Sequence, residues 1–259
     1  MRARVLAGNI PVWRDMLRSA ADPEKFDIVT EVFSAATLSA DAYDLALPFT
    51  RKENELIQGV PEAASRTLLP SESHRRLGND KLAFAQWLVD AGFRRNVPKF
   101  AVDPIICFPL IRKRRIGANG QRCRLYVDEA DLVDDPTTPD ESDFYQECIR
   151  GQREYATHTI SVAGTVLFMG TTVSVHDADV FVKGKGEIPS EISPHANVAV
   201  PEIKGIIAAL GYTGHACFDY KLKADMPMFF EMNPRIGYSS YLYADVLLET
   251  SLRALACLG

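Results

Sequence analysis

Short apolar runs alternate with a helix-like stretch over the first part of the chain. RVLAG, FDIVTEVF and YDLALPF are the apolar runs, and PVWRDMLRSA begins at Pro11. Proline is favoured at the first position of a helix. Alternation of strands and helices is typical of an α/β unit. We therefore expect a short α/β lobe over residues 1–78, in which residues 61–78, with the polar stretch 71–78, are the nearest thing to a linker.

After residue 78 the pattern changes to one helix followed mainly by strands. Asn79 and Asp80 are suited to cap a helix that ends at Gly92. Further helices are expected at 201–210 and 241–258, and a loop at 181–194. Strands are expected at 98–102, 106–114, 121–127, 143–149, 154–162, 165–175, 215–223 and 228–233. This order predicts an α+β fold with an antiparallel bias.

Composition limits the classes of protein. Of the 259 residues 47% are hydrophobic and 24% are charged, which is typical of a globular protein that can form a core. The length allows one large domain or several lobes around one site, and composition does not decide between them. The net charge of -5 gives no global positive field. We therefore expect neither nucleic acid nor a membrane as a partner.

Cysteine usage and hydropathy predict the compartment. The five cysteines form no C-x-x-C pair, and several lie in apolar stretches, so they are interpreted as reduced core thiols. The N-terminal residues lack a long apolar segment, and the most apolar stretch is interrupted by Lys99 and Asp103. We expect a cytoplasmic protein.

The most specific chemistry lies in residues 218–237, FDYKLKADMPMFFEMNPRIG. If its two apolar runs pair as antiparallel strands, Asp219, Glu231 and Asn233 converge at one end of the pair. Magnesium is held in this way, by one or two carboxylates together with substrate phosphates. Asp219 and Glu231 alone would fit a surface hairpin with solvated acids better.

The residues around these acids resemble a family signature. E-x-N-P-R-I-G at residues 231–237 is similar to the end of the catalytic strand in ATP-grasp enzymes such as biotin carboxylase, D-alanine:D-alanine ligase and carbamoyl phosphate synthetase. The resemblance implies a fold in which two α+β lobes grip ATP. It implies that Asp219, Glu231 and Asn233 hold two Mg²⁺ ions, with Mn²⁺ as an alternative. Arg235 would face the transferred phosphoryl group or the substrate carboxylate.

Two lysine motifs agree with this resemblance. N-D-K at residues 79–81 matches the early lysine of the family, and FPLIRKRRIGANGQ places Lys113 on a strand before a glycine-containing loop. By resemblance, Lys81 and Lys113 flank the triphosphate. The backbone around Gly117 and Gly120 would cover the γ-phosphate, since glycine lets the main chain approach closely.

An adenine-binding stretch is the third element of the resemblance. Residues 145–154, YQECIRGQRE, are similar to the segment that meets the adenine edge in ATP-grasp enzymes. The resemblance assigns Gln146, Glu147 and the backbone of Ile149 to adenine, and Glu154 to the ribose hydroxyls. Taken without the other motifs, Glu154 would be interpreted as an exposed glutamate at a strand end.

A later loop adds two candidate cations. Lys183 and Lys185 are flanked by glycines, where family members often place another phosphate or substrate contact. A solvated loop explains both lysines equally well. Walker A, G-x-S-x-G and G-x-G-x-x-G motifs are absent from the sequence.

The resemblance implies an ATP- and Mg²⁺-dependent ligase with a short lobe at 1–78 and an ATP-grasp domain at 79–259. Such an enzyme activates a small-molecule carboxylate as an acyl phosphate for attack by an amine or thiol. The alternatives are a kinase-like phosphotransferase on the same fold and a non-catalytic ATP-binding module. The sequence leaves the acid, the acceptor and homo-oligomer formation open.

Overall fold

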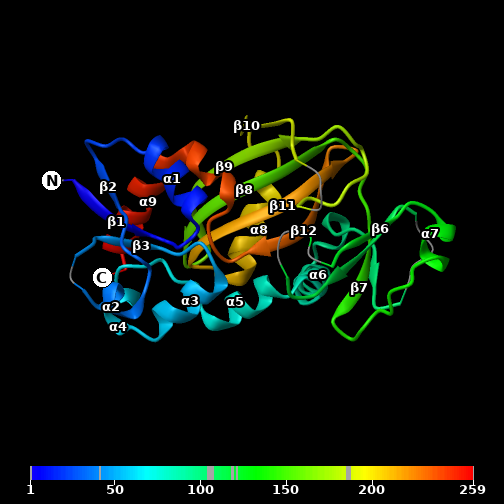
Figure 1. The fold of residues 1–259 in the computed structure, drawn as a ribbon, viewed down its shortest axis with the longest axis horizontal. Coiled ribbons are helices and arrows are strands. Elements are labelled where there is room, and N and C mark those ends of the chain that lie inside the picture. Colours follow the sequence, from blue (N-terminus) through cyan, green and yellow to red (C-terminus); the bar gives the residue numbers. More distant parts are fainter. Residues whose placement is uncertain are drawn as a thin grey trace.

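The computed structural model describes residues 2–40, 42–103, 108–117, 120, 122–184 and 188–258. Figure 1 shows the N-terminal lobe at one end, a large twisted sheet in the middle and a small sheet at the other end. The first sheet is parallel, and the other two are antiparallel. The α+β fold class is therefore confirmed.

The N-terminal lobe has a parallel sheet in the order β2-β1-β3. Neighbouring residues of β1 point to opposite faces, so Val5 packs into one buried cluster and Leu6 into another. This confirms the predicted α/β lobe. Its elements are β1 (Ala3–Ala7), α1 (Pro11–Ala20), β2 (Phe26–Val29), α2 (Ala35–Ser39), β3 (Leu45–Leu47), α3 (Arg51–Gln58), α4 (Pro61–Ala64) and α5 (Glu72–Asn79).

The predicted linker at 61–78 is wrong, because most of it is helical. Ser71 caps α5 by accepting a hydrogen bond from the backbone N–H of His74. At Gly78 an added Cβ would lie 2.9 Å from the carbonyl oxygen of Met232, so the helix backbone lies directly on β12. The helix was not predicted from the sequence because most side chains of α5 are polar. The domain boundary after residue 78 stays a prediction.

The central sheet has the order β10-β9-β8-β11-β12. Its strands are β8 (Arg153–Val162), β9 (Thr165–Val175), β10 (Glu191–His195), β11 (Gly214–Lys223) and β12 (Met226–Asn233). Phe218, Tyr220 and Phe229 of this sheet pack in a core with residues of α6 and α8. Edge strand β10 overlaps the last residues of the predicted loop 181–194, so that part of the loop prediction is wrong. Pro227 belongs to β12, and the β11–β12 turn falls at 224–225.

Helices and 3-10 turns surround the central sheet. They are α6 (Lys81–Asp90), η1 (Arg94–Asn96), α8 (Val200–Leu210), η2 (Tyr238–Tyr243) and α9 (Ala244–Ala256). Asp80 accepts hydrogen bonds from the backbone N–H groups of Leu82 and Ala83, which confirms the predicted cap. Leu247 and Leu248 of α9 belong to the same buried cluster as Val5, so the last helix joins the two lobes (Figure 1).

The small sheet has the order β4-β7-β5-β6. Its elements are β4 (Phe100–Ala101), β5 (Leu110–Arg114), β6 (Arg124–Tyr126), α7 (Glu129–Val133) and β7 (Asp143–Glu147). Asp135 lies 3.1 Å from Arg112 and 2.8 Å from Arg124, and only 5% of its side chain is exposed. A buried ion network therefore supports this small lobe. Among the described residues, no helix is long and apolar enough to cross a membrane.

Candidate active site

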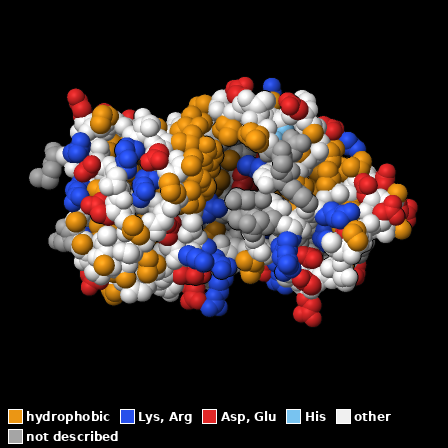
Figure 2. All heavy atoms as spheres, in the orientation of Figure 1, with side chains coloured by type: hydrophobic (Ala, Val, Ile, Leu, Met, Phe, Trp, Pro, Cys, Tyr) orange, Lys and Arg blue, Asp and Glu red, His pale blue; other side chains and the backbone are white. Residues whose placement is uncertain are grey.

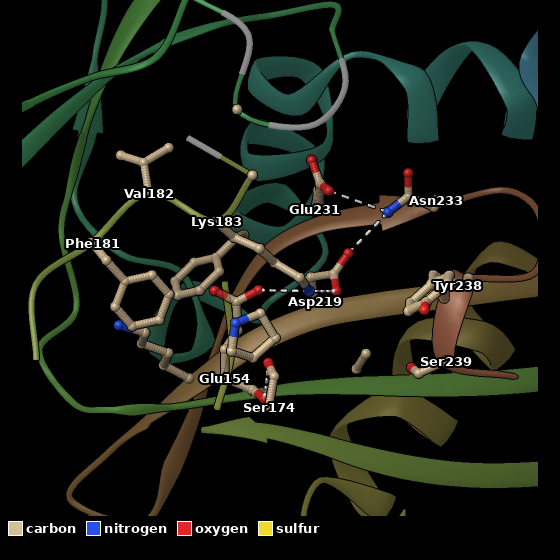
Figure 3. A pocket seen from close by; sticks show the side chains of 18 of the residues that line it. Glu154, Ser174, Phe181, Val182, Lys183, Asp219, Glu231, Asn233, Tyr238 and Ser239 are labelled. Atoms are coloured by element: carbon tan, nitrogen blue, oxygen red, sulfur yellow. Dashed lines mark hydrogen bonds and ion pairs between the residues drawn. The ribbon is translucent and has the colours of Figure 1, made fainter. Parts of the chain in front are cut away.

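A cavity lies between the central sheet and the small sheet. Figure 3 shows Phe181 and Val182 at one end, Tyr238 and Ser239 at the other, and Asp219 between them. We call these the Phe181 end and the Tyr238 end. Eleven of the sequence-predicted site residues line this cavity. They are Lys81, Lys113, Gly120, Glu147, Ile149, Glu154, Lys183, Asp219, Glu231, Asn233 and Arg235. Gly117 does not line it, but its carbonyl oxygen accepts a hydrogen bond from Lys81.

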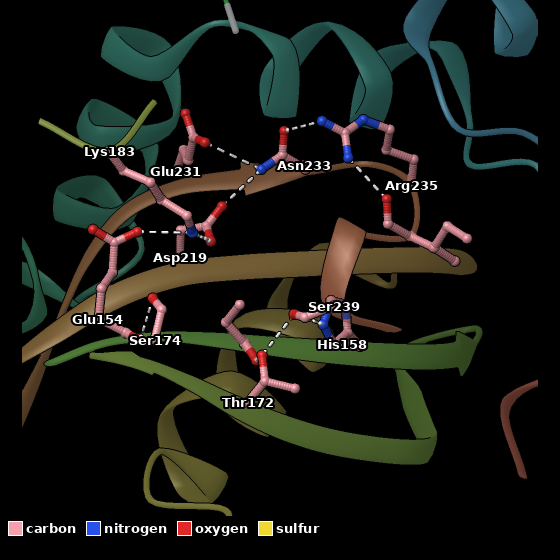
Figure 4. Close-up of polar contacts among 12 residues, drawn as sticks. Glu154, His158, Thr172, Ser174, Lys183, Asp219, Glu231, Asn233, Arg235 and Ser239 are labelled. Atoms are coloured by element: carbon pink, nitrogen blue, oxygen red, sulfur yellow. Dashed lines mark hydrogen bonds and ion pairs between the residues drawn. The ribbon is translucent and has the colours of Figure 1, made fainter. Parts of the chain in front are cut away.

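Three oxygen-bearing side chains meet in the middle of the cavity. Asp219 and Glu231 are directly opposite in the β11–β12 register. The amide nitrogen of Asn233 lies 3.0 Å from an oxygen of Asp219 and 3.2 Å from an oxygen of Glu231 (Figure 4). One atom therefore bridges both carboxylates, which confirms the predicted strand pairing and convergence.

Two lysines neutralise these acids. Lys81 Nζ lies 3.1 Å from Glu231 and donates a hydrogen bond to the backbone carbonyl of Gly117. Lys183 Nζ lies 2.9 Å from Glu154 and 3.3 Å from Asp219. Each acid of the pair therefore has its own cation, and both cations come from outside the central sheet.

The surroundings shift the pKa values of Asp219 and Glu231 in opposite directions. Burial raises the pKa of Asp219, and the charge of Glu231 adds to this rise, while Lys183 only partly opposes it. Burial also disfavours ionised Glu231, but Lys81 and Lys113 outweigh it and lower the pKa of Glu231. Glu231 is therefore the more strongly ionised member of the pair.

The arrangement fits a hard divalent cation. The three side chains supply oxygen ligands, and the point bridged by the Asn233 nitrogen is close to both carboxylates. The Asn233 oxygen accepts a hydrogen bond from Arg235 at 3.1 Å, so the amide must turn to offer oxygen to a cation. Among the described residues there is no cluster of three His, Cys, Asp or Glu with metal-binding geometry. Two acids and one amide make up the candidate set.

The Phe181 end combines apolar walls with buried cations. Lys113 Nζ donates to the side-chain oxygen of Gln146 at 2.7 Å and lies over the ring of Phe230. Burial lowers the pKa of Lys113. Lys221 lies over the ring of Phe181, and its Nζ has no hydrogen-bond partner among the described residues. Both ammonium groups are therefore available to an anionic or hydrogen-bonding ligand.

One predicted adenine contact is placed differently. Gln146 is 1% exposed and does not line the cavity, because its side chain is turned to Lys113. It positions Lys113 from behind and does not present its side chain to a ligand. Glu147 and Ile149 do line the cavity, and Glu147 forms an ion pair with Lys223. Their adenine contacts stay predictions.

The predicted glycine loop approaches the Lys183 segment closely. Gly120 has φ +62°, and an added Cβ would lie 2.6 Å from the carbonyl oxygen of Lys183. Only glycine fits such a contact without a shift of the backbone. Gly117 lies beside Lys81, as described above. The candidate Lys185 lies outside the described residues.

The family follows from a sequence comparison. A model of the ATP-grasp domain matches residues 78–239. The chain belongs to the ATP-grasp family. The matched range runs from α5 into η2 and contains every described site residue named above. No curated protein matches the chain in sequence.

Solved structures support the ATP-grasp fold over the whole chain. D-alanine–D-alanine ligase from Bacillus anthracis is 18% identical, with a TM-score of 0.62 over 99% of this chain and 98% of that one. L-amino acid ligase from Bacillus licheniformis is 16% identical, with a TM-score of 0.64 over 98% of this chain and 74% of that one. The biotin carboxylase domain of 2-oxoglutarate carboxylase from Hydrogenobacter thermophilus is 14% identical, with a TM-score of 0.64 over 99% and 70%. At these identities the likeness shows the fold.

The Tyr238 end of this ATP-grasp cavity was missed by sequence reasoning. Ser239 shares a hydrogen bond of 3.0 Å with His158 and one of 2.7 Å with Thr172 (Figure 4). Burial, together with the charges of Lys183 and Arg235, lowers the pKa of His158 to about 3. The imidazole is therefore neutral at pH 7.

Two features of the sequence could have indicated further residues of the cavity. Strand alternation puts Cys217, Asp219 and Lys221 on one face of β11, and all three line the cavity. Gly237 ends the family signature, and an added Cβ there would lie 2.7 Å from the sulfur of Cys217 and from the ring of His158. This glycine therefore allows η2 to close over β8 and β11.

Proposed function

We propose that this ATP-grasp protein is an ATP- and Mg²⁺-dependent ligase that joins a small carboxylic acid to an amine or thiol. The observation that carries the proposal is the position of Asp219, Glu231 and Asn233 between two different ends of one cavity. A phosphoryl group held at these side chains would lie between a nucleotide on one side and a second substrate on the other. The ligases among the similar structures agree with this class.

The nucleotide would occupy the Phe181 end. The apolar walls of that end suit a base, and Lys113 projects from a strand toward the same space. A phosphate chain running from there toward Asp219 would pass Lys113 and Lys81. At an effective dielectric of ~20, a lysine at ~4 Å from a phosphate charge contributes on the order of 4 kcal/mol. Glu154 lies along the same path and would meet the ribose or release Lys183 to the phosphates.

Magnesium would be held by Asp219, Glu231 and Asn233, and it would neutralise charge on the phosphate oxygens. Its binding requires that the Asn233 amide turn and that Lys183 leave Asp219. Lys183 would then be free to contact the nucleotide. The protein therefore exchanges internal ion pairs for contacts with the charged ligand.

The reaction would proceed in two transfers. A carboxylate oxygen of the acid attacks the γ-phosphorus of ATP, the bond to the bridging oxygen breaks, and ADP leaves with the electron pair. An amine or thiol then attacks the acyl carbon, loses its proton, and inorganic phosphate departs. Arg235 would hold the acid carboxylate, and Lys81 and Lys113 would stabilise charge on the transferring group.

Product analysis tests this proposal. The protein is incubated with ATP, Mg²⁺ and panels of acids and amines, and ADP, free phosphate and the mass of new products are measured. A ligase gives equal ADP and phosphate, and a product with the mass of acid plus amine minus water. ADP with a phosphoester and no free phosphate would contradict a ligase and indicate a kinase. Nucleotide binding without any turnover across the panels would indicate a binding module.

A further inference from the structure

Two aromatic rings form a ledge at the Tyr238 end of the cavity. Trp13 of α1 and Tyr238 of η2 both line the cavity, with ring centroids 5.8 Å apart and planes inclined by 53°. Tyr238 is 37% exposed, so the pair is not fully used in packing. We call this pair the aromatic ledge.

The ledge is held in place from behind. The ring of Phe49, which is 1% exposed, lies 5.5 Å from that of Trp13. On the other side, Tyr241 packs edge-on against Tyr238. A fixed aromatic surface loses little side-chain entropy when a ligand covers it.

A mainly apolar groove lies on the surface beside the ledge, since its residue Tyr241 packs against Tyr238. That groove is lined by Tyr241 and by residues of α1 that include Val12, Met16 and Ala20. Figure 2 shows hydrophobic side chains gathered beside a hollow on this face, where Figure 1 draws α1 beside the chain that leads into α9. Asp15 and Ser19 also line this groove, so an apolar ligand that extends beyond the ledge would meet a mainly apolar surface.

Charge at this end favours an acid. The guanidinium of Arg235 lies 5.4 Å from the Trp13 ring centroid, and two of its nitrogens donate to Ile236 and Asn233. The other side chains here that the structure describes as lining the cavity are neutral, among them His158 and Ser239. A carboxylate would find a cation beside the ledge, whereas an ammonium group would find no acid there.

We infer that the acid substrate carries an aromatic or similarly bulky apolar tail, which lies on the aromatic ledge while its carboxylate meets Arg235. This inference rests on the proposed ligase function and narrows its substrate class. The tail carries no second negative charge, because the charged side chain described as lining the groove next to Tyr241 is the acid Asp15.

Fluorescence of Trp13 tests the inference without turnover. The sequence has two tryptophans, and Trp87 stacks on Phe84 in α6 and does not line the cavity, so Trp87→Phe leaves Trp13 as the reporter. With MgADP present, this variant is titrated with 3-phenylpropionate, propionate and 2-phenylethylamine. We expect a saturable change in emission with 3-phenylpropionate, at a Kd roughly 10-fold or more below that of the other two, because only this probe has both ring and carboxylate. Equal affinity for propionate, or for the amine, would overturn the inference.

Two ledge variants supply an independent reading by calorimetry. Tyr238→Ala and Trp13→Leu should each weaken 3-phenylpropionate roughly 10-fold and leave propionate and MgADP unchanged. If Trp13→Leu fails to fold, because the ring also packs on Phe49, the more exposed Tyr238 decides the matter. Unchanged affinity for 3-phenylpropionate in Tyr238→Ala would overturn the inference. If the unmodified protein does not bind MgADP, that result would instead contradict the proposed function.

Discussion

The two ends of the cavity are formed by different residue types and different secondary-structure elements. At the Phe181 end, charged side chains such as Lys113 of the small sheet and Lys221 of the central sheet project from regular strands into an apolar space. At the Tyr238 end, Trp13, His158 and Tyr238 come from a helix, a strand and a 3-10 turn that are far apart in sequence. A phosphate chain needs charges at fixed positions, which strands held in hydrogen-bonded sheets provide. A variable organic tail needs only a surface of suitable shape, which can be assembled from any nearby segments.

The supports beneath the two ends differ in the same way. The aromatic ledge is backed by a large hydrophobic cluster that joins the N-terminal lobe to α9. Among the residues that the structure describes, the small sheet that carries Lys113 packs in two small apolar clusters, and the ion network around Asp135 crosses it. We therefore expect charge substitutions to affect the nucleotide side most, and apolar substitutions the other side.

The largest effect is expected where the two ends meet. Glu231→Gln keeps the size of the side chain but removes the charge opposite Lys81 and beside Asp219. Turnover should fall roughly 10²-fold or more, comparable to the loss of one preorganised electrostatic group. ADP release with substrates present is the measurement, alongside a thermal melt that should show a folded protein. Glu249→Gln, an exposed acid on α9, is the matched control and should keep normal turnover.

Near-normal turnover in a folded Glu231→Gln protein would remove the metal site from the account. It would also remove the reason to assign the nucleotide to one end of the cavity and the second substrate to the other, since no metal site would then lie between them.

The second effect concerns the ion network of the small sheet. Burial alone would raise the pKa of Asp135, but hydrogen bonds from Thr137 and Tyr126 and the charge of Arg112 outweigh it and lower that pKa. Asp135→Asn should therefore reduce the free energy of unfolding by about 2 kcal/mol at pH 7, because Arg112 loses its buried partner. Asp134→Asn, its exposed neighbour, is the control and should be nearly neutral.

The sign of the pH dependence follows from the lowered pKa of Asp135. The stabilisation is complete above the unfolded-state pKa and is lost as the pH falls toward the folded-state value. The difference in the free energy of unfolding between the parent protein and Asp135→Asn, measured by urea unfolding, should thus become smaller below about pH 4. A constant difference in the free energy of unfolding down to pH 3 would show that the charge of Asp135 does not account for the stability that the ion network provides.

The smallest effect separates two lysines of the cavity. Lys113 contacts a neutral amide, whereas Lys183 is already paired with Glu154 and Asp219. Lys113→Met should therefore raise the Kd for MgADP roughly 10-fold, and Lys183→Met less, because removing Lys183 also frees the acids for metal. Calorimetry on both variants compares them directly. The reverse order would mean that the phosphates pass along the Lys183 segment and not along β5.

Sequence predicted the strand-borne part of the site because alternation along strands is regular. The β11–β12 pairing follows from two apolar runs and a short turn, and it brings Asp219 to Glu231 without any further information. The Asp80 cap and the helix that begins at Lys81 could equally be predicted from sequence, since capping is a local interaction.

Tertiary contacts account for what sequence reasoning missed. Nothing local indicates that Trp13 meets Tyr238, that Gln146 turns to Lys113, or that Lys183 reaches Asp219. Strand β10 was read as loop because an edge strand needs little hydrophobic patterning. The helix at 72–79 was read as linker because its polar surface outweighs its narrow packed face.

Transfer of labelled oxygen tests the central claim most directly. The acid that best stimulates ADP release is prepared with ¹⁸O in its carboxylate and incubated with the protein, ATP, Mg²⁺ and the amine. If the carboxylate attacks the γ-phosphorus and an amine then displaces phosphate, one ¹⁸O atom appears in each phosphate released, as mass spectrometry would show. Unlabelled phosphate, formed in step with ADP and the joined product, would contradict an acyl phosphate and with it the proposed ligase chemistry.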